Sequence, residues 1–369
     1  MLKYSAPGKL FISGEWSILE MGNQGIVAAV DKRVHSVIEE SDELSITIDD
    51  FNIKDLKCEF DGKNLVFSSD VSDIKGKLQF IKESIETALR FLNDNKIEAK
   101  PFRIRTWGEE SQIVIDGAPK KIGFGSSASS TVAVIASVLG FHDCRATKEE
   151  IFKLATIAHY FAQGKVGSAF DVAASTYGGL FVYSRFDPEW LTKKMESSDS
   201  IKDIVSDEWS GLLIEELEIP KDFVLLIGWT KESASTSAMV KQMNEFKKNN
   251  PERYKKAIDD VAHCAREAIY AWHDNDWEKL IVELQNNEQA LARLGRLSGV
   301  NIETPDIKKL ADIADESGGA GKLSGAGGGD CGIAVCFDES TAEKIKEGWT
   351  NAGLYIVDAA IDKEGLRIE

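Results

Sequence analysis

Hydrophobic and polar positions follow two different periods along the chain. In the first 60 residues, short aliphatic runs (LFI, VAAV, VHSVI and LSITI) are separated by turn residues, which predicts a series of short strands. Apolar residues then recur every three or four positions from Leu78 to Asn93, which predicts a helix. A two-residue alternation at 102–107 predicts a half-buried strand with Arg103 and Arg105 on its solvated face. The first third of the chain therefore mixes strands and helices.

The two periods continue to the end of the chain. A glycine-serine loop leads directly into an apolar helix that ends at Gly140. Further helices are predicted at 148–161, 253–272, 277–294 and 306–315, and strands at 223–229 and 332–337, before a last helix and strand. The acidic, weakly periodic segment near 190–218 is interpreted as a connection. The predicted division is an N-terminal lobe at 1–190, a connection at 191–219 and a C-terminal lobe at 220–369.

The charge balance narrows the possible partners. The chain has 44 Lys and Arg against 61 Asp and Glu, a formal net charge of −17, so we expect neither nucleic acid nor an anionic membrane surface as a partner. A hydrophobic fraction of 43% and a charged fraction of 28% are typical of a folded globular protein. No apolar run approaches the ~20 residues of a membrane span, and the N-terminus does not resemble a signal peptide. These features predict a cytoplasmic protein.

The cysteines support the same location. There are five, an odd number, scattered along the chain without a CxxC pair. This pattern argues against a disulfide framework and against a zinc site, and free thiols are typical of a reducing compartment.

The segment GFGSSASST at Gly123 to Thr131 is the first candidate for chemistry. Glycines let a backbone approach an anion closely, serines add hydroxyl donors, and a following helix directs its unpaired N–H groups at the same point. The pattern predicts a phosphate-binding loop, although a flexible glycine-serine turn would have the same composition. No lysine follows the second glycine, so the loop is not the GxxxxGK[ST] motif of P-loop nucleotide-binding proteins.

Three other segments carry candidate residues. In SGAGGGDCG, from Ser324 to Gly332, closely spaced glycines allow either contact with a ligand or a tight turn before a strand. Lys9 in APGKLFISGEW is either a cation of the site or a solvated charge. Asp171 in GKVGSAFDVAA is either a capping residue or a functional carboxylate, and spacing alone does not choose between these roles.

Taken together, these segments resemble one family. APGKLFISGEWSIL, GFGSSASS and SGAGGGDCG are similar, in this order and at suitable separations, to the three motifs of the GHMP kinases, which include homoserine, galactose, mevalonate and phosphomevalonate kinases. AQGKVGSAFDVAASTYGG, LLIGWTKESASTSAMVKQM and GAGGGDCGIA resemble the phosphomevalonate kinases in particular. The resemblance implies a two-lobed α+β fold, with an N-terminal, ATP-binding lobe like ribosomal protein S5 domain 2 and a ferredoxin-like C-terminal lobe.

The resemblance also implies roles for individual residues. Lys9 and Asp171 would be catalytic, and Ser127 would be the motif serine nearest Mg²⁺. The ATP phosphates would contact Lys121, Gly123, Gly125, Ser126, Ser127, Ala128 and Ser129. Candidates for the acceptor side are Lys165, Gly167, Ser168, Ser235, Ser237, Ser324, Gly325, Ala326 and Gly327, although serines of this kind also occur as turn or cap residues.

The implied reaction is phosphoryl transfer from ATP, with Mg²⁺, to 5-phosphomevalonate, which gives 5-diphosphomevalonate for isoprenoid synthesis. A phosphate monoester with a second pKa of about 6 is mostly dianionic at pH 7, so it needs little help from a base. Our hypothesis is that Lys9 screens the donor and acceptor oxygens while Asp171 positions Lys9 and the attacking phosphate. The cleft is then expected to be a basic island built from Lys9, helix N-termini, Mg²⁺ and Lys165.

One position departs from the pattern of the mevalonate kinases. These enzymes carry a glutamate about 11 residues before the catalytic aspartate, where this chain has Tyr160. The departure favours Mg²⁺ held by the ATP phosphates, water and Ser127. Mevalonate kinase, mevalonate-phosphate decarboxylase and a non-catalytic sensor on the same fold remain alternatives, as do a monomer and a homodimer.

Overall fold

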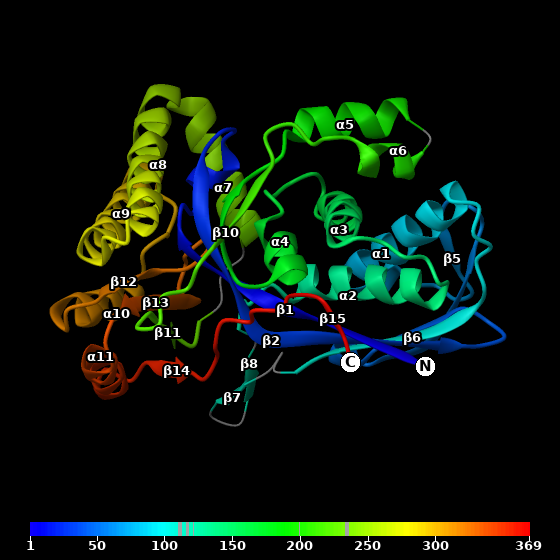
Figure 1. Cartoon of the computed structure of the whole chain (residues 1–369), viewed down its shortest axis with the longest axis horizontal. Helices are drawn as coiled ribbons and strands as arrows, with labels where there is room; N and C mark the ends of the chain where they lie inside the picture. Colours follow the sequence, from blue (N-terminus) through cyan, green and yellow to red (C-terminus); the bar gives the residue numbers. More distant parts are fainter. Residues whose placement is uncertain (110–112, 116–117, 121, 199, 233–235) are drawn as a thin grey trace.

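The computed structural model describes residues 1–109, 113–115, 118–120, 122–198, 200–232 and 236–369 (Figure 1). It has two lobes. In the N-terminal lobe, helices cover one face of a large sheet, whose strand order is β10-β9-β2-β6-β3-β4-β5, with β1 paired to β2 and β15. The strands are β1 (Leu2–Ser13), β2 (Gln24–Glu40), β3 (Ser45–Ile48), β4 (Ile53–Phe60), β5 (Leu65–Phe67), β6 (Phe102–Gly108), β9 (Leu180–Ser184), β10 (Leu213–Leu217) and β15 (Arg367–Ile368).

The helices of this lobe stack above the sheet in Figure 1. They are α1 (Lys75–Asp94), α2 (Ser126–Phe141), α3 (Lys148–Ala162), α4 (Phe170–Tyr177), α5 (Pro188–Ser197) and α6 (Ile201–Ser206), with short 3₁₀ turns at Ser17–Leu19, Asp49–Phe51 and Ser72–Ile74. A hairpin of β7 (Ile113–Ile115) and β8 (Ala118–Lys120) projects away from them. The helices predicted at 78–93, 126–140 and 148–161 are confirmed.

The strands predicted at LFI and LSITI are present in β1 and β3, but the separation of VAAV from VHSVI is wrong. VAAV and VHSVI belong to a single strand of 17 residues, β2, which continues through the polar residues between them. Its partner β1 absorbs the irregularity through a register shift between Pro7 and Gly8. Arg33, in the middle of β2, is buried and makes an ion pair with Asp362. A polar residue thus interrupts the sequence pattern without interrupting the strand.

The segment interpreted as a connection contains regular structure. It includes most of α5, all of α6 and the strand β10, which pairs with β9 at the edge of the N-terminal sheet. The position of the lobe boundary stays a prediction.

The C-terminal lobe is a four-stranded antiparallel sheet with helices, in the order β12-β13-β11-β14. The helices and strands predicted for this lobe are confirmed, and the structure adds α7 and β12, which the sequence pattern did not predict. The elements are β11 (Val224–Trp229), α7 (Thr236–Asn249), α8 (Pro251–His273), α9 (Trp277–Ser298), α10 (Pro305–Glu316), β12 (Ala320–Leu323), β13 (Cys331–Cys336), α11 (Glu339–Asn351) and β14 (Tyr355–Val357).

One hydrophobic cluster spans both lobes. It joins Leu10 and Ile12 of β1 to Trp229 of β11, Trp272 of α8 and Ile333 of β13. Because these side chains are buried against one another, separating the lobes would expose apolar surface, and their relative position is fixed by packing.

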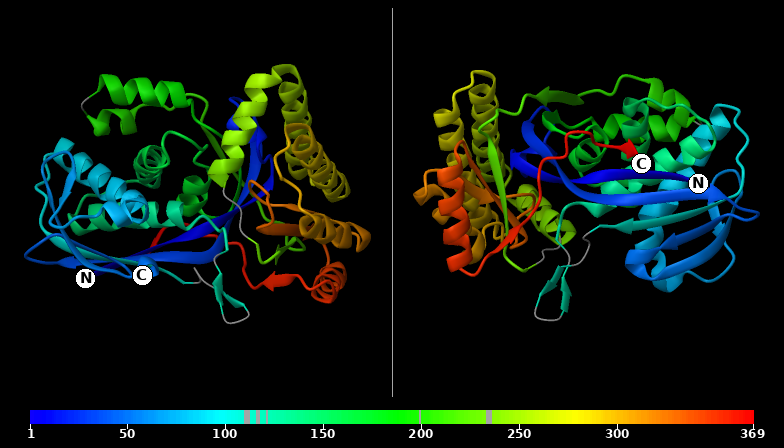
Figure 2. Two further views of the ribbon diagram at one scale, coloured as in Figure 1. Left: turned by 180° about the vertical axis from the view of Figure 1, so that it is seen from behind. Right: turned by 60° about the horizontal axis from the view of Figure 1, so that its bottom comes forward.

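The end of the chain also connects the lobes. After β14 it runs back to the N-terminal sheet, where Tyr4 and Ser5 of β1 pair with Ile368 and Arg367 of β15, so that the two termini lie close together (Figure 2). Within the described ranges, no helix is both long and apolar enough to cross a membrane.

Candidate active site

The predicted phosphate loop lies between β1 and the start of α2. Gly125 has a φ of 82° and forms the N-cap of α2, and no side chain in the described part of the chain caps this helix. The loop packs closely on β1, because the Phe124 carbonyl accepts the backbone N–H of Lys9 at 2.9 Å. A Cβ on Gly8 would lie 2.8 Å from that carbonyl oxygen, so glycine is needed there. The open N-terminus of α2 suits an anion.

Lys9 projects from β1 onto this loop. Its ammonium donates a hydrogen bond to the Gly123 carbonyl at 3.0 Å and lies 5.7 Å from the centre of the Phe170 ring. The side chain is half-buried rather than solvated. The Asp330 carboxylate is near enough for the Lys9 charge to oppose the rise in the pKa of Asp330 that burial causes. Lys9 is therefore a cation inside the site.

A histidine joins Ser127 and Asp171. Nε2 of His159, in α3, lies 3.2 Å from the Ser127 hydroxyl and 3.9 Å from Oδ2 of Asp171. Asp171 sits in the first turn of α4, where its Oδ1 accepts the Val172 N–H and the helix N-terminus favours a negative charge. Burial lowers the pKa of His159, an effect that the Asp171 charge opposes. The imidazole is therefore neutral near pH 7.

Tyr160, which stands where the mevalonate kinases carry a glutamate, is the neighbour of this histidine in the chain. It is buried against Phe161 and Phe186 in the core. On a helix, adjacent residues face different directions, so a shift of one position separates a core residue from one that faces the site. His159 was missed because neither its helix nor its spacing from Ser127 marks it in the sequence.

The other predicted residues of the phosphate loop divide into two groups. Gly123, Gly125, Ser126 and Ser127 are partly exposed. Ala128 is buried, and the Ser129 hydroxyl donates to the Pro7 carbonyl at 2.7 Å, which ties α2 to β1. Lys121 lies outside the described residues.

The loop that begins at Ser324, which we call the third glycine loop because it carries the third motif, belongs to the C-terminal lobe and packs against β1. The Ser324 hydroxyl donates to the Phe11 carbonyl at 3.0 Å and accepts the Phe11 N–H at 2.9 Å, so its contacts fasten the loop to the strand. The Ala326 carbonyl accepts the Trp16 indole N–H. Gly325 and Gly327 have φ values of 95° and 83°, which require glycine.

The loop between α3 and α4 holds the remaining described candidates. Lys165 is exposed, with its ammonium 3.9 Å from Glu196. The Ser168 hydroxyl is buried and has no hydrogen-bond partner within the described residues. Arg185, which the sequence analysis did not single out, donates to the carbonyls of Gly167 at 3.0 Å and Leu19 at 2.6 Å. Ser235 lies outside the described residues, as does the side chain of Ser237.

Comparison with known proteins agrees with this geometry. The family model described as the GHMP kinases N terminal domain matches residues 80–179, and the one described as GHMP kinases C terminal matches 253–354. A phosphomevalonate kinase from Streptomyces sp. (strain CL190) is 31% identical over 375 residues, covering 98% of this chain and 97% of the relative. The chain belongs to the GHMP kinase family.

Two solved structures resemble this GHMP kinase over nearly its whole length. The Lin0012 protein from Listeria innocua has a TM-score of 0.90 at 32% identity, covering 100% of this chain and 99% of that one. The Streptococcus pneumoniae phosphomevalonate kinase in complex with phosphomevalonate and AMPPNP has a TM-score of 0.82 at 26% identity, covering 98% and 100%. The two-lobed α+β GHMP kinase fold expected from the sequence is confirmed.

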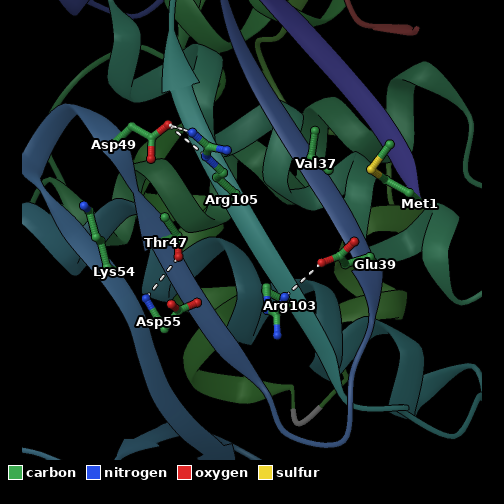
Figure 3. A pocket seen from close by; sticks show the side chains of 9 residues that line it. All are labelled: Met1, Val37, Glu39, Thr47, Asp49, Lys54, Asp55, Arg103 and Arg105. Carbon is green, nitrogen blue, oxygen red and sulfur yellow. Dashed lines mark hydrogen bonds and ion pairs between the residues drawn. The ribbon is translucent and has the colours of Figure 1, made fainter.

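One pocket of this GHMP kinase lies away from the three glycine loops. It has a volume of about 400 Å³ and lies on the outer face of the N-terminal sheet (Figure 3). Its guanidinium groups are already paired, Arg103 with Glu39 at 3.2 Å and Arg105 with Asp49 at 2.7 Å. The pocket contains none of the motif residues, so the loops around Lys9 are the better candidate for catalysis.

Proposed function

We propose that this GHMP kinase transfers the γ-phosphoryl group of ATP to the phosphate of 5-phosphomevalonate, giving ADP and 5-diphosphomevalonate in the mevalonate pathway. The observation that carries the proposal is that Lys9 contacts the phosphate loop while His159 joins Ser127 of that loop to Asp171. This arrangement lies in a fold shared over 98% of the chain with an enzyme solved with phosphomevalonate and AMPPNP. ATP is the donor, and phosphomevalonate is the acceptor.

The chain's own groups fit a reaction between two phosphates. The transferring group carries its charge on equatorial oxygens, so positioning and cations matter more than a base. Lys9 supplies a half-buried ammonium at the phosphate loop, and α2 supplies an uncapped N-terminus beside it. The recorded contacts place Lys9 next to Gly123 and Asp171 next to His159, so a direct role of Asp171 in positioning Lys9 stays a prediction.

The residues also fit Mg²⁺ brought in with ATP. Mg²⁺ prefers oxygen ligands and keeps several waters, and the Ser127 hydroxyl offers such an oxygen beside His159, whose Nε2 also lies near Asp171. The described residues contain no group of three or more His, Cys, Asp or Glu that could hold a metal by themselves. Ser127, water and the ATP phosphates would then share the ion, which neutralises phosphate charge. The neutral His159 would hold the two side chains in place.

Arg185 is a strong candidate for recognising an anionic part of the acceptor. Its guanidinium is largely buried between the α3–α4 loop and Leu19, and burial lowers its pKa. Its Nε has no partner in the described part of the chain, and the same holds for the nearby Ser168 hydroxyl. Buried polar groups normally have partners, so both are available to a ligand carboxylate or phosphate.

Substitutions at Lys9 and Asp171 test the proposed roles. We expect Lys9→Ala to lower kcat by at least about 100-fold, because charge stabilisation in the site is lost. We expect Asp171→Asn to cost less, since a dianionic phosphate needs little deprotonation. Steady-state ADP release with phosphomevalonate gives both values. A much larger loss for Asp171→Asn would show that a carboxylate base is essential and would contradict the screening role of Lys9.

The cellular location and the oligomeric state stay predictions. The five cysteines are all free, which supports a reducing cytoplasmic location. A monomer and a homodimer are both compatible with the site, because every motif residue comes from one chain.

A further inference from the structure

Asp330 lies where the two lobes meet, at the end of the third glycine loop and directly before β13. Its Oδ1 accepts the backbone N–H of Gly123 at 3.3 Å and the indole N–H of Trp229 at 3.1 Å. Trp229 is buried in β11. One carboxylate oxygen therefore connects the sheet of the C-terminal lobe to the phosphate loop of the N-terminal lobe.

The same glycine is held from its other side by Lys9. The ammonium of Lys9 donates to the Gly123 carbonyl at 3.0 Å, while its backbone N–H donates to the Phe124 carbonyl at 2.9 Å. The Gly123 peptide groups thus lie between the cation of the first motif and the anion of the third. The charge of Lys9 and the two N–H groups oppose the rise in the pKa of Asp330 that burial causes.

The approach of Asp330 to the loop leaves no room for a side chain. A Cβ on Gly123 would overlap Oδ2 of Asp330. Gly125 has a positive φ, but Gly123 does not, so alanine at position 123 would displace the Asp330 carboxylate rather than strain the backbone. The constraint on the residue at position 123 therefore comes from the position of Asp330 and not from the backbone conformation of the loop.

We propose that Asp330 is a positioning residue for phosphoryl transfer, which acts through Gly123 to fix the phosphate loop against Lys9. It need not touch either substrate. A loop fixed from both lobes would receive the ATP phosphates without first being ordered, so losing the contact should weaken ATP binding more than acceptor binding. The inference rests on the proposed function only in taking this loop as the ATP site.

Paired substitutions at Asp330 separate positioning from bulk stability. Asp330→Ala should raise the KM for ATP and the Kd for AMPPNP about tenfold, the loss expected for these hydrogen bonds. The KM for phosphomevalonate should change less than about twofold, and kcat should fall less than the ATP KM rises. Asp330→Asn should stay near wild type, because its amide oxygen can accept both N–H groups. Equal effects on both substrates, or failure of the Asn variant, would overturn the proposal.

A double-mutant cycle tests the contact itself. Gly123→Ala should weaken AMPPNP binding about tenfold in the wild type but have little further effect beside Asp330→Ala, where the clash is removed. Additive losses would overturn the proposal. Asp330→Ser replaces the Ala variant in the cycle if the latter does not fold. Asp312→Asn, in an exposed ion pair of α10, is the control and should change nothing.

AMPPNP binding needs no acceptor. If the chain phosphorylated a different acceptor, the binding results would still decide the role of Asp330, and only the proposed substrate would be wrong.

Discussion

Two buried ion pairs hold segments from the C-terminal half of the chain against the N-terminal lobe, and they differ in how completely their polar atoms are satisfied. At the C-terminal tail, Arg33 pairs with Asp362 and also donates to the Ser5 hydroxyl and carbonyl and to the Gly365 carbonyl, at 2.7–2.8 Å. Every nitrogen of this guanidinium has an acceptor. Buried charges are tolerated when their hydrogen bonds are this complete, so the ion pair holds the C-terminal tail firmly against β1 and β2. We call this contact the tail joint.

The second ion pair lies beside the candidate active site, in a group formed by Lys322, Glu15 and Glu288 that we call the catalytic-edge cluster. Lys322 of β12 pairs with Glu15, from the first motif, and donates to the Leu323 carbonyl at 2.7 Å. Glu288 of α9 accepts the Leu323 N–H at 2.9 Å. One oxygen each of Glu15 and Glu288 has no partner among the described residues, and burial raises the pKa of Glu288 to about 8.

The difference indicates two kinds of contact. The ion pair at the tail is fully hydrogen-bonded, whereas the cluster beside the candidate site contains a carboxyl group, that of Glu288, which titrates. Two carboxylates and one ammonium leave the catalytic-edge cluster with an excess negative charge unless Glu288 holds a proton. Stability at this edge therefore depends on pH, whereas the tail contact should hold across the same range. The predictions below test this contrast.

Removing the charge of the tail joint should have the largest effect. Arg33→Ala leaves Asp362 buried and unpaired, and we expect a loss of about 3–5 kcal/mol in the free energy of unfolding. Urea denaturation measures it. Arg367→Ala, an exposed arginine on the same tail, is the matched control and should cost less than about 1 kcal/mol. Equal losses for the two variants would show that the buried Arg33–Asp362 pair contributes no more to stability than an exposed ion pair.

Removing the cation at the catalytic edge should cost less. Lys322→Met keeps the volume of the side chain, and we expect a loss of about 2–3 kcal/mol at pH 8 and a smaller loss at pH 6, because the carboxylates can be protonated instead. Lys308→Met, in an exposed pair with Asp312, is the control. A loss as large as that of Arg33→Ala, and independent of pH, would mean that the two ion pairs stabilise the fold in the same way.

Glu288 should give the smallest change near pH 5 and the clearest pH signature. Its folded-state pKa, about 8, lies above the usual value of 4.5, so the folded protein binds the extra proton and stability falls as pH rises between these values. Glu288→Gln should remove this slope, of about 1 kcal/mol per pH unit, and be more stable than wild type above pH 8. Thermal unfolding from pH 5 to pH 9 measures both. Parallel pH curves would contradict the assignment.

Much of the fold could be predicted from local patterns. The stripes of α1, α8 and α9 and the alternation of β6 are set by residues close in sequence, which is why their bounds agree with the structure to within a few residues. The length of β2 could not, because Arg33 is buried only through partners at the far end of the chain. Contacts of that kind leave no periodic signal.

The site shows the same limit. The three motifs were found because their glycines and serines are contiguous in sequence. His159 and Asp330 were missed, since each acts through a residue of another segment, Ser127 and Gly123 respectively. Lys165, expected in a basic island, is exposed beside Glu196, so its role at the acceptor stays a prediction.

The identity of the acceptor is the most direct test of the account. An equimolar mixture of mevalonate and 5-phosphomevalonate is incubated with limiting ATP and Mg²⁺, and the products are followed by ³¹P NMR and by CO₂ release. We predict coupled diphosphate resonances of ADP and 5-diphosphomevalonate in equal amounts, with mevalonate unchanged and no CO₂. Growth of the phosphomonoester signal with loss of mevalonate would instead identify a mevalonate kinase, CO₂ release a decarboxylase, and no consumption of ATP a non-catalytic protein; each result would contradict the proposed function.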